Sequence, residues 1–219
     1  MVPLVCSRIP SAGAFSLIEL LVVVAIIALL AALAVPAFNS IGQARGVSEA
    51  AYQIASAVEL ARSEAVSRHT FVWMGMQPQT NSGTLDLRIG LVYSKDGTAN
   101  TSAGNLQAIG RALLIQRVGL TNAAGLSVGT NLGAPTELCP YSGGATFQIG
   151  QMNFSSGRTI TFTPLGEATT NATPSSTSGF DSRIAVGLQQ VRGTTPMAKN
   201  DIAVVVDGSV GLPTIYQKK

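Results

Sequence analysis

The chain has 219 residues, a net charge of +3 at neutral pH and only 11% charged residues, against about 25% in an average soluble protein. Ser, Thr, Asn and Gly replace the missing charges, which is typical of extracytoplasmic, β-rich surfaces. About 180 residues follow the apolar segment near the N-terminus, enough for one domain with its own core. So small a charge excess does not by itself indicate binding to nucleic acid or to an anionic membrane.

The apolar segment begins the chain's first predicted element. Sixteen residues from Leu20 to Val35 carry no polar side chain. A helix from Phe15 to Val35 would be about 30 Å long, the thickness of a bilayer core. Glu19 lies near its start, where a carboxylate is costly and therefore points to a function.

Three interpretations of residues 1–38 are open. An ordinary secretory signal peptide would be cleaved near Ala32-Leu33-Ala34, but its apolar region is normally shorter and Glu19 would be out of place. A plain membrane anchor explains the length and leaves Glu19 unexplained. A third interpretation accounts for both features.

The stretch Ala14-Phe15-Ser16-Leu17-Ile18-Glu19-Leu20 resembles the cleavage and methylation signal of type IV prepilins and type II secretion pseudopilins. The resemblance implies that a prepilin peptidase removes the leader 1–14 between Ala14 and Phe15, and that Phe15 is then N-methylated. Glu19 becomes the fifth residue of the mature chain and Pro36 the twenty-second, as the family has them. Ala14 in place of the usual Gly, and Arg8 as the only leader cation, depart from the pattern.

Glu19 and Pro36 are the residues expected to act in assembly. Cleavage creates an α-amino group four residues before Glu19, and in a filament of packed helices this ammonium can neutralise a carboxylate of its own or a neighbouring chain. Removing one partner of such a buried pair costs on the order of 3–5 kcal/mol. The alternative is that Glu19 extends to the lipid headgroups.

Residues 37–68 are predicted to extend the transmembrane helix 15–36 as an amphipathic helix. Pro36 is expected to kink or loosen the helix, and Gly42 and Gly46 indicate a flexible stretch. An apolar stripe follows at helical spacing, comprising Val47, Ala51, Ile54, Val58, Ala61 and Ala65.

Residues 69–219 are predicted to form one β-rich globular domain. The expected strands are Thr70–Met76, Leu85–Tyr93, Ala112–Val118, Thr159–Thr163, Ile184–Val191, Ile202–Val206 and a last one near Val210–Ile215. The expected surface loops are Thr98–Asn105, Thr121–Tyr141 and Ala168–Gly179. Trp73, Met74 and Met76 are expected in the core.

Three further segments resemble the H-type minor pseudopilins and the related FimT-type minor pilins. They are Leu60–Val66 on the long helix, Ile160–Gly166 and Ile202–Val210. The resemblance implies an α+β, type IV pilin-like fold, in which a long N-terminal helix, transmembrane in its first half, packs on an antiparallel β-sheet.

No catalytic, cofactor-binding or metal-binding residues are expected. His69, the only histidine, lies at the predicted helix C-terminus, where its partial charge is favourable. Asp201 and Asp207 with Asn200 suit either a calcium site or, more simply, turns. Cys6 precedes the predicted cleavage site, so Cys139 would have no intramolecular disulfide partner.

The sequence thus predicts a structural, non-enzymatic subunit of a type II secretion pseudopilus or type IV pilus, anchored in the inner membrane with its domain outside the cytoplasm. The implied partners are prepilin peptidase, other pilin subunits, the inner-membrane assembly platform and the lipid bilayer. Two alternatives remain: an exported protein with an ordinary signal peptide, and a DNA-binding minor pilin. DNA binding is the less favoured of these functions. The basic residues that could contact DNA are Arg183, Arg192, Lys199, Lys218 and Lys219.

Overall fold

The structure is a computed structural model. It describes residues 16–121, 136–137, 145–149, 152–154, 158–174, 181–197 and 201–217, and the side chains of residues 32–45 are not described. The chain divides into two compact units, residues 1–42 and 43–219, and each is considered by itself below.

Helix α1 is assigned from Leu17 to Arg68; its predicted range was Phe15 to Arg68. The stretch from Pro36 to Gly46, expected to be loosened, is helical. A proline removes one backbone hydrogen bond and a glycine costs about 1 kcal/mol, and neither interrupts the assigned helix. Within the described residues, no helical segment combines the length and apolar content that a membrane span requires. Phe15 and the side chains of residues 32–36 of the predicted span lie outside the described part.

The second unit is built from β-strands around the C-terminal part of α1. The strands assigned among the described residues are β1 (Val72–Asn81), β2 (Thr84–Ser94), β3 (Leu106–Ala108), β4 (Leu113–Ile115), β5 (Val118–Thr121), β6 (Thr136–Glu137), β7 (Phe147–Ile149), β8 (Met152–Phe154), β9 (Thr159–Phe162), β10 (Ala168–Thr169), β11 (Arg183–Arg192), β12 (Thr195–Pro196), β13 (Ile202–Asp207) and β14 (Pro213–Gln217). They belong to two six-stranded sheets and one two-stranded hairpin, β7–β8.

The first sheet has the order β10-β9-β1-β2-β3, with β4 also paired to β2. The second has the order β12-β11-β13-β14, with β5 and β6 also paired to β11. Pairing is antiparallel throughout the described residues except between β6 and β11. The α+β class with a long helix and antiparallel sheet is therefore confirmed, and the second sheet is an addition to it.

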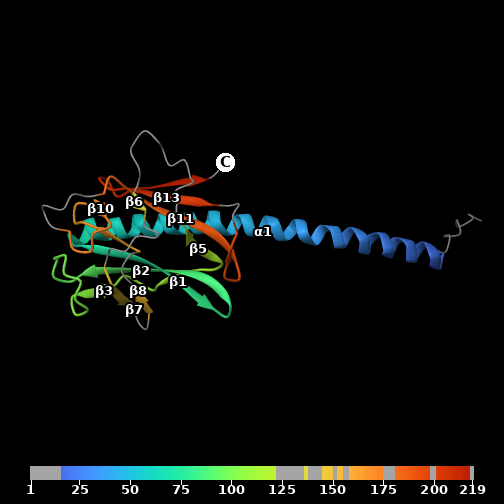
Figure 1. Cartoon of the computed structure of the whole chain (residues 1–219), viewed down its shortest axis with the longest axis horizontal. Coiled ribbons are helices and arrows are strands. Elements are labelled where there is room, and N and C mark those ends of the chain that lie inside the picture. Colours follow the sequence, from blue (N-terminus) through green and yellow to red (C-terminus); the bar gives the residue numbers. More distant parts are fainter. Residues whose placement is uncertain are drawn as a thin grey trace, which may run out of the picture. The chain divides into compact units, whose positions relative to one another are not determined.

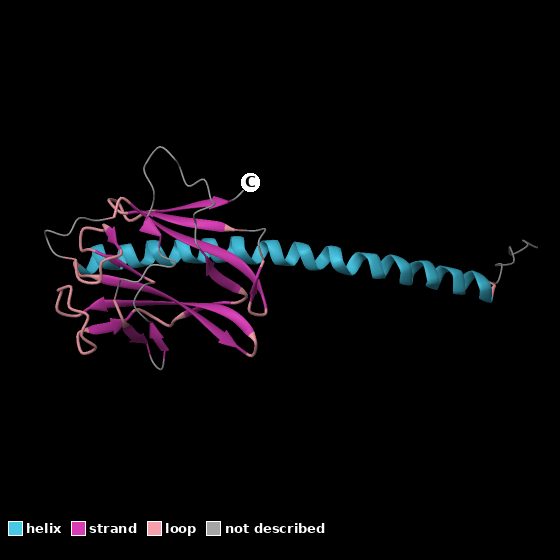
Figure 2. Ribbon diagram, viewed as in Figure 1, coloured by secondary structure: helices cyan, strands magenta, loops and turns pink. Residues whose placement is uncertain are grey.

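The core lies between α1 and both sheets (Figures 1 and 2). The predicted apolar stripe from Val47 to Ala65 is confirmed, because all six of its members are fully buried. The strands meet it with Met74 of β1, Ile160 of β9 and Val204 of β13, all fully buried. A narrow stripe of small and β-branched side chains lets the helix approach two sheets at once.

The prediction of one continuous strand over Ala112–Val118 was wrong. Its first part is β4 in the first sheet and its second part begins β5 in the second sheet. Arg117 between them has a positive φ of 58°, and its N–H donates to Asp86 Oδ1 at 3.1 Å. This left-handed turn redirects the chain from one sheet to the other.

The other predicted strands have matching elements with shifted ends: β1, β2, β9, β11, β13 and β14. Two predicted loops were partly wrong. Thr121–Tyr141 contains β6 and Ala168–Gly179 begins with β10, since two-residue strands pair with distant segments and leave no local signal. The loop Thr98–Asn105 contains no assigned strand.

A second, smaller core covers the outer face of the first sheet. It contains Trp73, buried as predicted, and the stacked rings of Phe147 and Phe154, whose centroids are 5.0 Å apart. Gly75 and Gly90 are paired across β1 and β2, and the two rings lie directly on them. A side chain at either glycine would collide with the aromatic rings, so these two positions of the sheet need glycine as long as the β7–β8 hairpin carries Phe147 and Phe154.

Gly90→Ala is expected to lower the free energy of unfolding by about 1–3 kcal/mol. A β-carbon at this position would lie 2.5 Å from Cζ of Phe154 and 2.7 Å from Cδ1 of Ile149. Chemical denaturation of the globular domain measures the effect. Adding Phe154→Leu should recover part of the loss, because the two changes share one contact; simple additivity would contradict the packing argument.

Candidate functional site

The start of α1 is the described part of the predicted assembly site. Ser16 precedes the first helical residue, and its N–H donates to Oε2 of Glu19 at 3.0 Å. Its hydroxyl oxygen accepts a weak hydrogen bond from the N–H of Ile18, with 3.4 Å between nitrogen and oxygen. This is a capping box, in which the residue before the helix and the third helical residue satisfy each other's backbone groups.

Glu19 therefore has a local structural role that the sequence interpretation missed, although the Ser-x-x-Glu spacing is a readable signal for it. Its carboxylate is exposed and held against the backbone at the helix start. The helix dipole also favours a negative charge there.

The side chains that follow Glu19 form an uncovered apolar surface. The large apolar side chains that the structure describes between Leu17 and Leu30 are between 48% and 83% exposed. They are Leu17, Ile18, Leu20, Leu21, Val22, Val23, Val24, Ile26, Ile27, Leu29 and Leu30. Exposed apolar area of this extent marks a surface that other helices or lipid cover. Of the other predicted site residues, Ala14 and Phe15 lie outside the described part, and Pro36 is described only as helical backbone.

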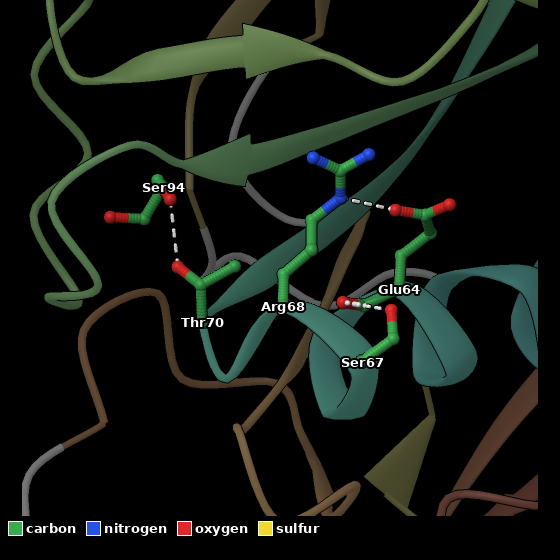
Figure 3. Close-up of polar contacts among 5 residues, drawn as sticks. All are labelled: Glu64, Ser67, Arg68, Thr70 and Ser94. Atoms are coloured by element: carbon green, nitrogen blue, oxygen red, sulfur yellow. Dashed lines mark hydrogen bonds and ion pairs between the residues drawn. The ribbon is translucent and has the colours of Figure 1, made fainter.

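The C-terminal end of α1 is fixed by a second cap, and Figure 3 shows the side-chain contacts of Glu64, Arg68, Thr70 and Ser94 beside it. His69 has a positive φ of 51°, its N–H donates to Val66 O, and the N–H of Thr70 donates to Ala65 O. These two bonds define a Schellman motif, so His69 has the expected structural role. Arg68 pairs with Glu64, and Thr70 Oγ1 donates to Ser94 O at 2.7 Å, which ties the helix end to β2.

His69→Gly is expected to stabilise the domain by about 0.5–1 kcal/mol. A left-handed conformation costs an L-residue about 1–2 kcal/mol, and the greater freedom of glycine in the unfolded chain cancels part of the gain. His69 is exposed, so few contacts are lost. Thermal unfolding measures the change, with His69→Ala as the control that keeps the strain. A glycine variant no more stable than the alanine variant would contradict this account.

The three segments that resemble minor pseudopilins meet at the C-terminal end of α1. Arg62 on the helix donates from Nε to the carbonyl of Val210, at 2.6 Å. A β-carbon on Gly166 would lie 3.1 Å from Val66 and 3.2 Å from Arg62 Nε, and one on Gly211 would lie 2.2 Å from Gly166 O. Helix, β9–β10 turn and β13–β14 turn thus close onto one another. The segments that resemble minor pseudopilins therefore make contacts that hold the fold together, and Arg62 contacts both turns.

The β13–β14 turn is held by Asp207. Its Oδ1 accepts hydrogen bonds from Ser209 Oγ at 2.6 Å, Ser209 N at 2.9 Å and Val210 N at 3.1 Å. The Ser209 hydroxyl, followed by the two backbone N–H groups and the charge of Arg183, holds the pKa of Asp207 below its usual range. Asp207 therefore stabilises the turn, which was the simpler of its two expected roles.

The lowered pKa of Asp207 predicts a pH dependence. A carboxyl whose folded pKa lies below its unfolded value, about 3.9, contributes stability above that value and loses it as the pH falls through the folded pKa. We therefore expect Asp207→Asn to be less stable than the native chain at pH 7, with the difference shrinking below pH 4. Urea unfolding from pH 7 to pH 2.5 measures this; a difference that is constant with pH would contradict it.

Of the basic residues considered for DNA binding, the two that the structure describes, Arg183 and Arg192, do not lie together. Arg183 and Arg192 lie at opposite ends of β11, about 30 Å apart along the strand. Arg183 is 5% exposed, whereas Arg192 is exposed. Lys199, Lys218 and Lys219 lie outside the described residues. These two arginines therefore do not form one phosphate-binding patch, because they lie far apart and the first is buried in the sheet.

No group of three or more His, Cys, Asp or Glu side chains positioned to hold a metal ion occurs in the described part of the chain. Of the calcium candidates, Asp207 belongs to the turn, Asp201 is partly buried, and Asn200 lies outside that part. Cys6 and Cys139 lie outside it as well.

Comparison with protein families gives two matches. Residues 10–35 match the prokaryotic N-terminal methylation motif. Residues 50–190, more than half of the chain, match the family described as type II transport protein GspH. No curated protein and no solved structure matches significantly. The first match contains Glu19, and the second begins on α1 and ends within β11.

Proposed function

Because the chain belongs to the type II transport protein GspH family and carries the N-terminal methylation motif, we propose that it is a minor pseudopilin that supports protein secretion from within a type II secretion pseudopilus. The family is one of structural, H-type pilin-like subunits, and the motif implies processing by a prepilin peptidase and assembly with other pilin subunits. In this proposal cleavage falls between Ala14 and Phe15, Phe15 is N-methylated, and α1 assembles into the filament through Glu19 and Pro36.

The capping box at Ser16 and Glu19 is the observation that carries the proposal. It holds the carboxylate 3.0 Å from the N–H of Ser16, one residue from the amine that cleavage would create. An ammonium there can pair with Glu19 of the same chain, or release it to pair with a neighbour, inside a core of low dielectric constant. Burial of this pair in a filament would also cover the exposed apolar residues of α1.

The proposed location follows from the same features. Before assembly, residues 15–36 cross the inner membrane, and Arg8 keeps the leader on the cytoplasmic side. The domain from residue 69 then faces the periplasm. The inner-membrane assembly platform and the lipid bilayer are the partners at this stage. Extraction of the helix from the bilayer into the filament exchanges lipid contacts for helix contacts, which requires no loss of apolar burial.

Mass spectrometry of the N-terminal peptide tests the processing step. We expect a mature chain that begins with N-methyl-Phe15 in cells containing the peptidase, and the uncleaved chain in cells without it. A mature N-terminus near Val35 would establish the ordinary signal peptide and overturn the proposal. Loss of secreted proteins on deletion of this subunit, restored by the native chain, tests the secretion role; unchanged secretion with normal processing would favour a type IV pilus.

A further inference from the structure

The side chain of Ser16 holds a backbone group in the first turn of α1. Its hydroxyl oxygen accepts a hydrogen bond from the N–H of Ile18, with 3.4 Å between nitrogen and oxygen. Ser16 itself lies outside the helix, which begins at Leu17. The helix therefore begins two residues after Phe15, whose peptide bond to Ala14 is the proposed cleavage site.

The N–H of Ile18 has a competing acceptor further upstream. In an α-helix each N–H donates to the carbonyl four residues before it, so a helix extended backwards would join the N–H of Ile18 to the carbonyl of Ala14. The N–H groups of a first turn lack partners within the helix, and backward extension is one way to satisfy them. The Ser16 hydroxyl satisfies this N–H instead, so it opposes extension of the helix across the cleavage site.

Cleavage requires this same carbonyl to be free. Hydrolysis adds a water molecule across the bond: its hydroxyl goes to the carbonyl carbon of Ala14 and a proton goes to the nitrogen of Phe15, which leaves as an amine. In the transition state the carbonyl oxygen becomes negative and needs hydrogen-bond donors from the peptidase. A carbonyl inside a helix already accepts an N–H from the following turn. The helix would therefore have to open before the bond could be hydrolysed.

Residue 14 strengthens this competition in the present chain. Alanine is the best helix former among the amino acids, and glycine is among the worst. Ala14, in place of the usual glycine, therefore favours extension of α1 across the cleavage site. A cap at Ser16 opposes that tendency, and a chain with glycine before the cleavage site would depend on the cap less.

The second bond of the capping box does not compete for this carbonyl. The N–H of Ser16, which donates to Oε2 of Glu19, would meet the carbonyl of Ala12 in an extended helix. That carbonyl lies before the cleavage site. Loss of the Glu19 carboxylate therefore leaves the Ser16 hydroxyl on the N–H of Ile18, and opposition to the extension depends on Ser16.

We propose that Ser16 is a positioning residue for cleavage by the prepilin peptidase: by capping α1 it keeps the Ala14–Phe15 bond outside the helix, and so compensates for alanine at residue 14. The inference rests on the proposed function, because it concerns the same cleavage. Ser16 takes no part in the hydrolysis itself. It raises the fraction of chains whose cleavage site is not helical, and the cleavage rate follows that fraction.

Initial cleavage rates of the full-length chain, measured in detergent with purified prepilin peptidase, test the proposal. We expect Ser16→Ala to be cleaved about fivefold more slowly than the native chain, which corresponds to the loss of one helix cap. Ser16→Asn should be cleaved at close to the native rate, since asparagine caps a helix as well as serine does. The matched control is Ser63→Ala, at an exposed position within α1, which should be cleaved like the native chain. Slow cleavage of Ser16→Asn would show that the peptidase reads the hydroxyl itself, and would overturn the capping role.

A double-mutant cycle with residue 14 gives an independent readout. In an Ala14→Gly background the loss caused by Ser16→Ala should shrink from about fivefold to less than about twofold, because the helix extends less readily across the site. An undiminished loss would overturn the compensation between residues 14 and 16, and equal rates for Ser16→Ala and the native chain would overturn the positioning role. In both cases cleavage of the native chain before Phe15 would still support the proposed function. A native chain left uncut at that bond would overturn both.

Discussion

Gly208→Ala is expected to lower the free energy of unfolding of the domain by about 3 kcal/mol or more. A β-carbon at this position would lie 1.4 Å from the carbonyl oxygen of Asp181 and 3.1 Å from that of Ala168. Neither neighbour is a flexible side chain that can rotate away. The backbone of the β13–β14 turn or the segment before β11 would have to move.

Such a movement would break the link between the two sheets. The N–H of Ala168 in β10 donates to Gly208 O at 2.7 Å, and the N–H of Gly208 donates to Ser182 O at 3.2 Å. Each buried backbone bond contributes about 0.5–1.5 kcal/mol, and leaving its partners unsatisfied costs more. The turn also carries Val210, whose carbonyl accepts from Arg62. One added methyl group therefore affects helix, first sheet and second sheet together.

Gly104→Ala is the matched control for this prediction, since no atom within 4 Å would meet its β-carbon and no positive φ is recorded for it. It should change the free energy of unfolding by less than about 0.5 kcal/mol. Urea unfolding of the two variants, followed by circular dichroism, measures the difference. A Gly208→Ala domain as stable as the Gly104→Ala domain would show that the close packing of the turn on Asp181 is not essential.

Glu19→Ala is expected to leave membrane insertion and cleavage intact and to reduce incorporation into filaments by about 100-fold or more. The reason is the uncompensated N-terminal ammonium that would remain in the apolar filament core, which costs on the order of 3–5 kcal/mol. Mass spectrometry of the mature terminus reports cleavage, and the amount of subunit in sheared filaments reports incorporation.

Glu19→Gln separates charge from capping. Glutamine at the third helical position can still accept the hydrogen bond from the N–H of Ser16, now made at 3.0 Å by the carboxylate. It cannot neutralise an ammonium. If charge pairing drives assembly, the glutamine variant fails like the alanine variant. Normal incorporation of Glu19→Gln, with failure of Glu19→Ala, would instead assign the role of Glu19 to capping α1.

Local patterns in the sequence were sufficient for the helix and for most strands. The stripe from Val47 to Ala65 predicted the buried face of α1, and the apolar, β-rich runs predicted β1, β2, β9, β11 and β13. The methylation motif is local as well, since cleavage and capping involve residues within one helical turn. These features depend on the periodicity of hydrophobic residues and on nearest neighbours, which a sequence displays directly.

Contacts between distant segments decided the rest. The division into two sheets depends on the left-handed turn at Arg117, and the burial of Arg183 depends on the neighbours of β11. The hydrogen bond between Arg62 of α1 and the carbonyl of Val210 likewise joins residues 148 positions apart in the chain. Hydrophobic periodicity says which face of an element is buried but not which distant element buries it, and these features are made of such pairings.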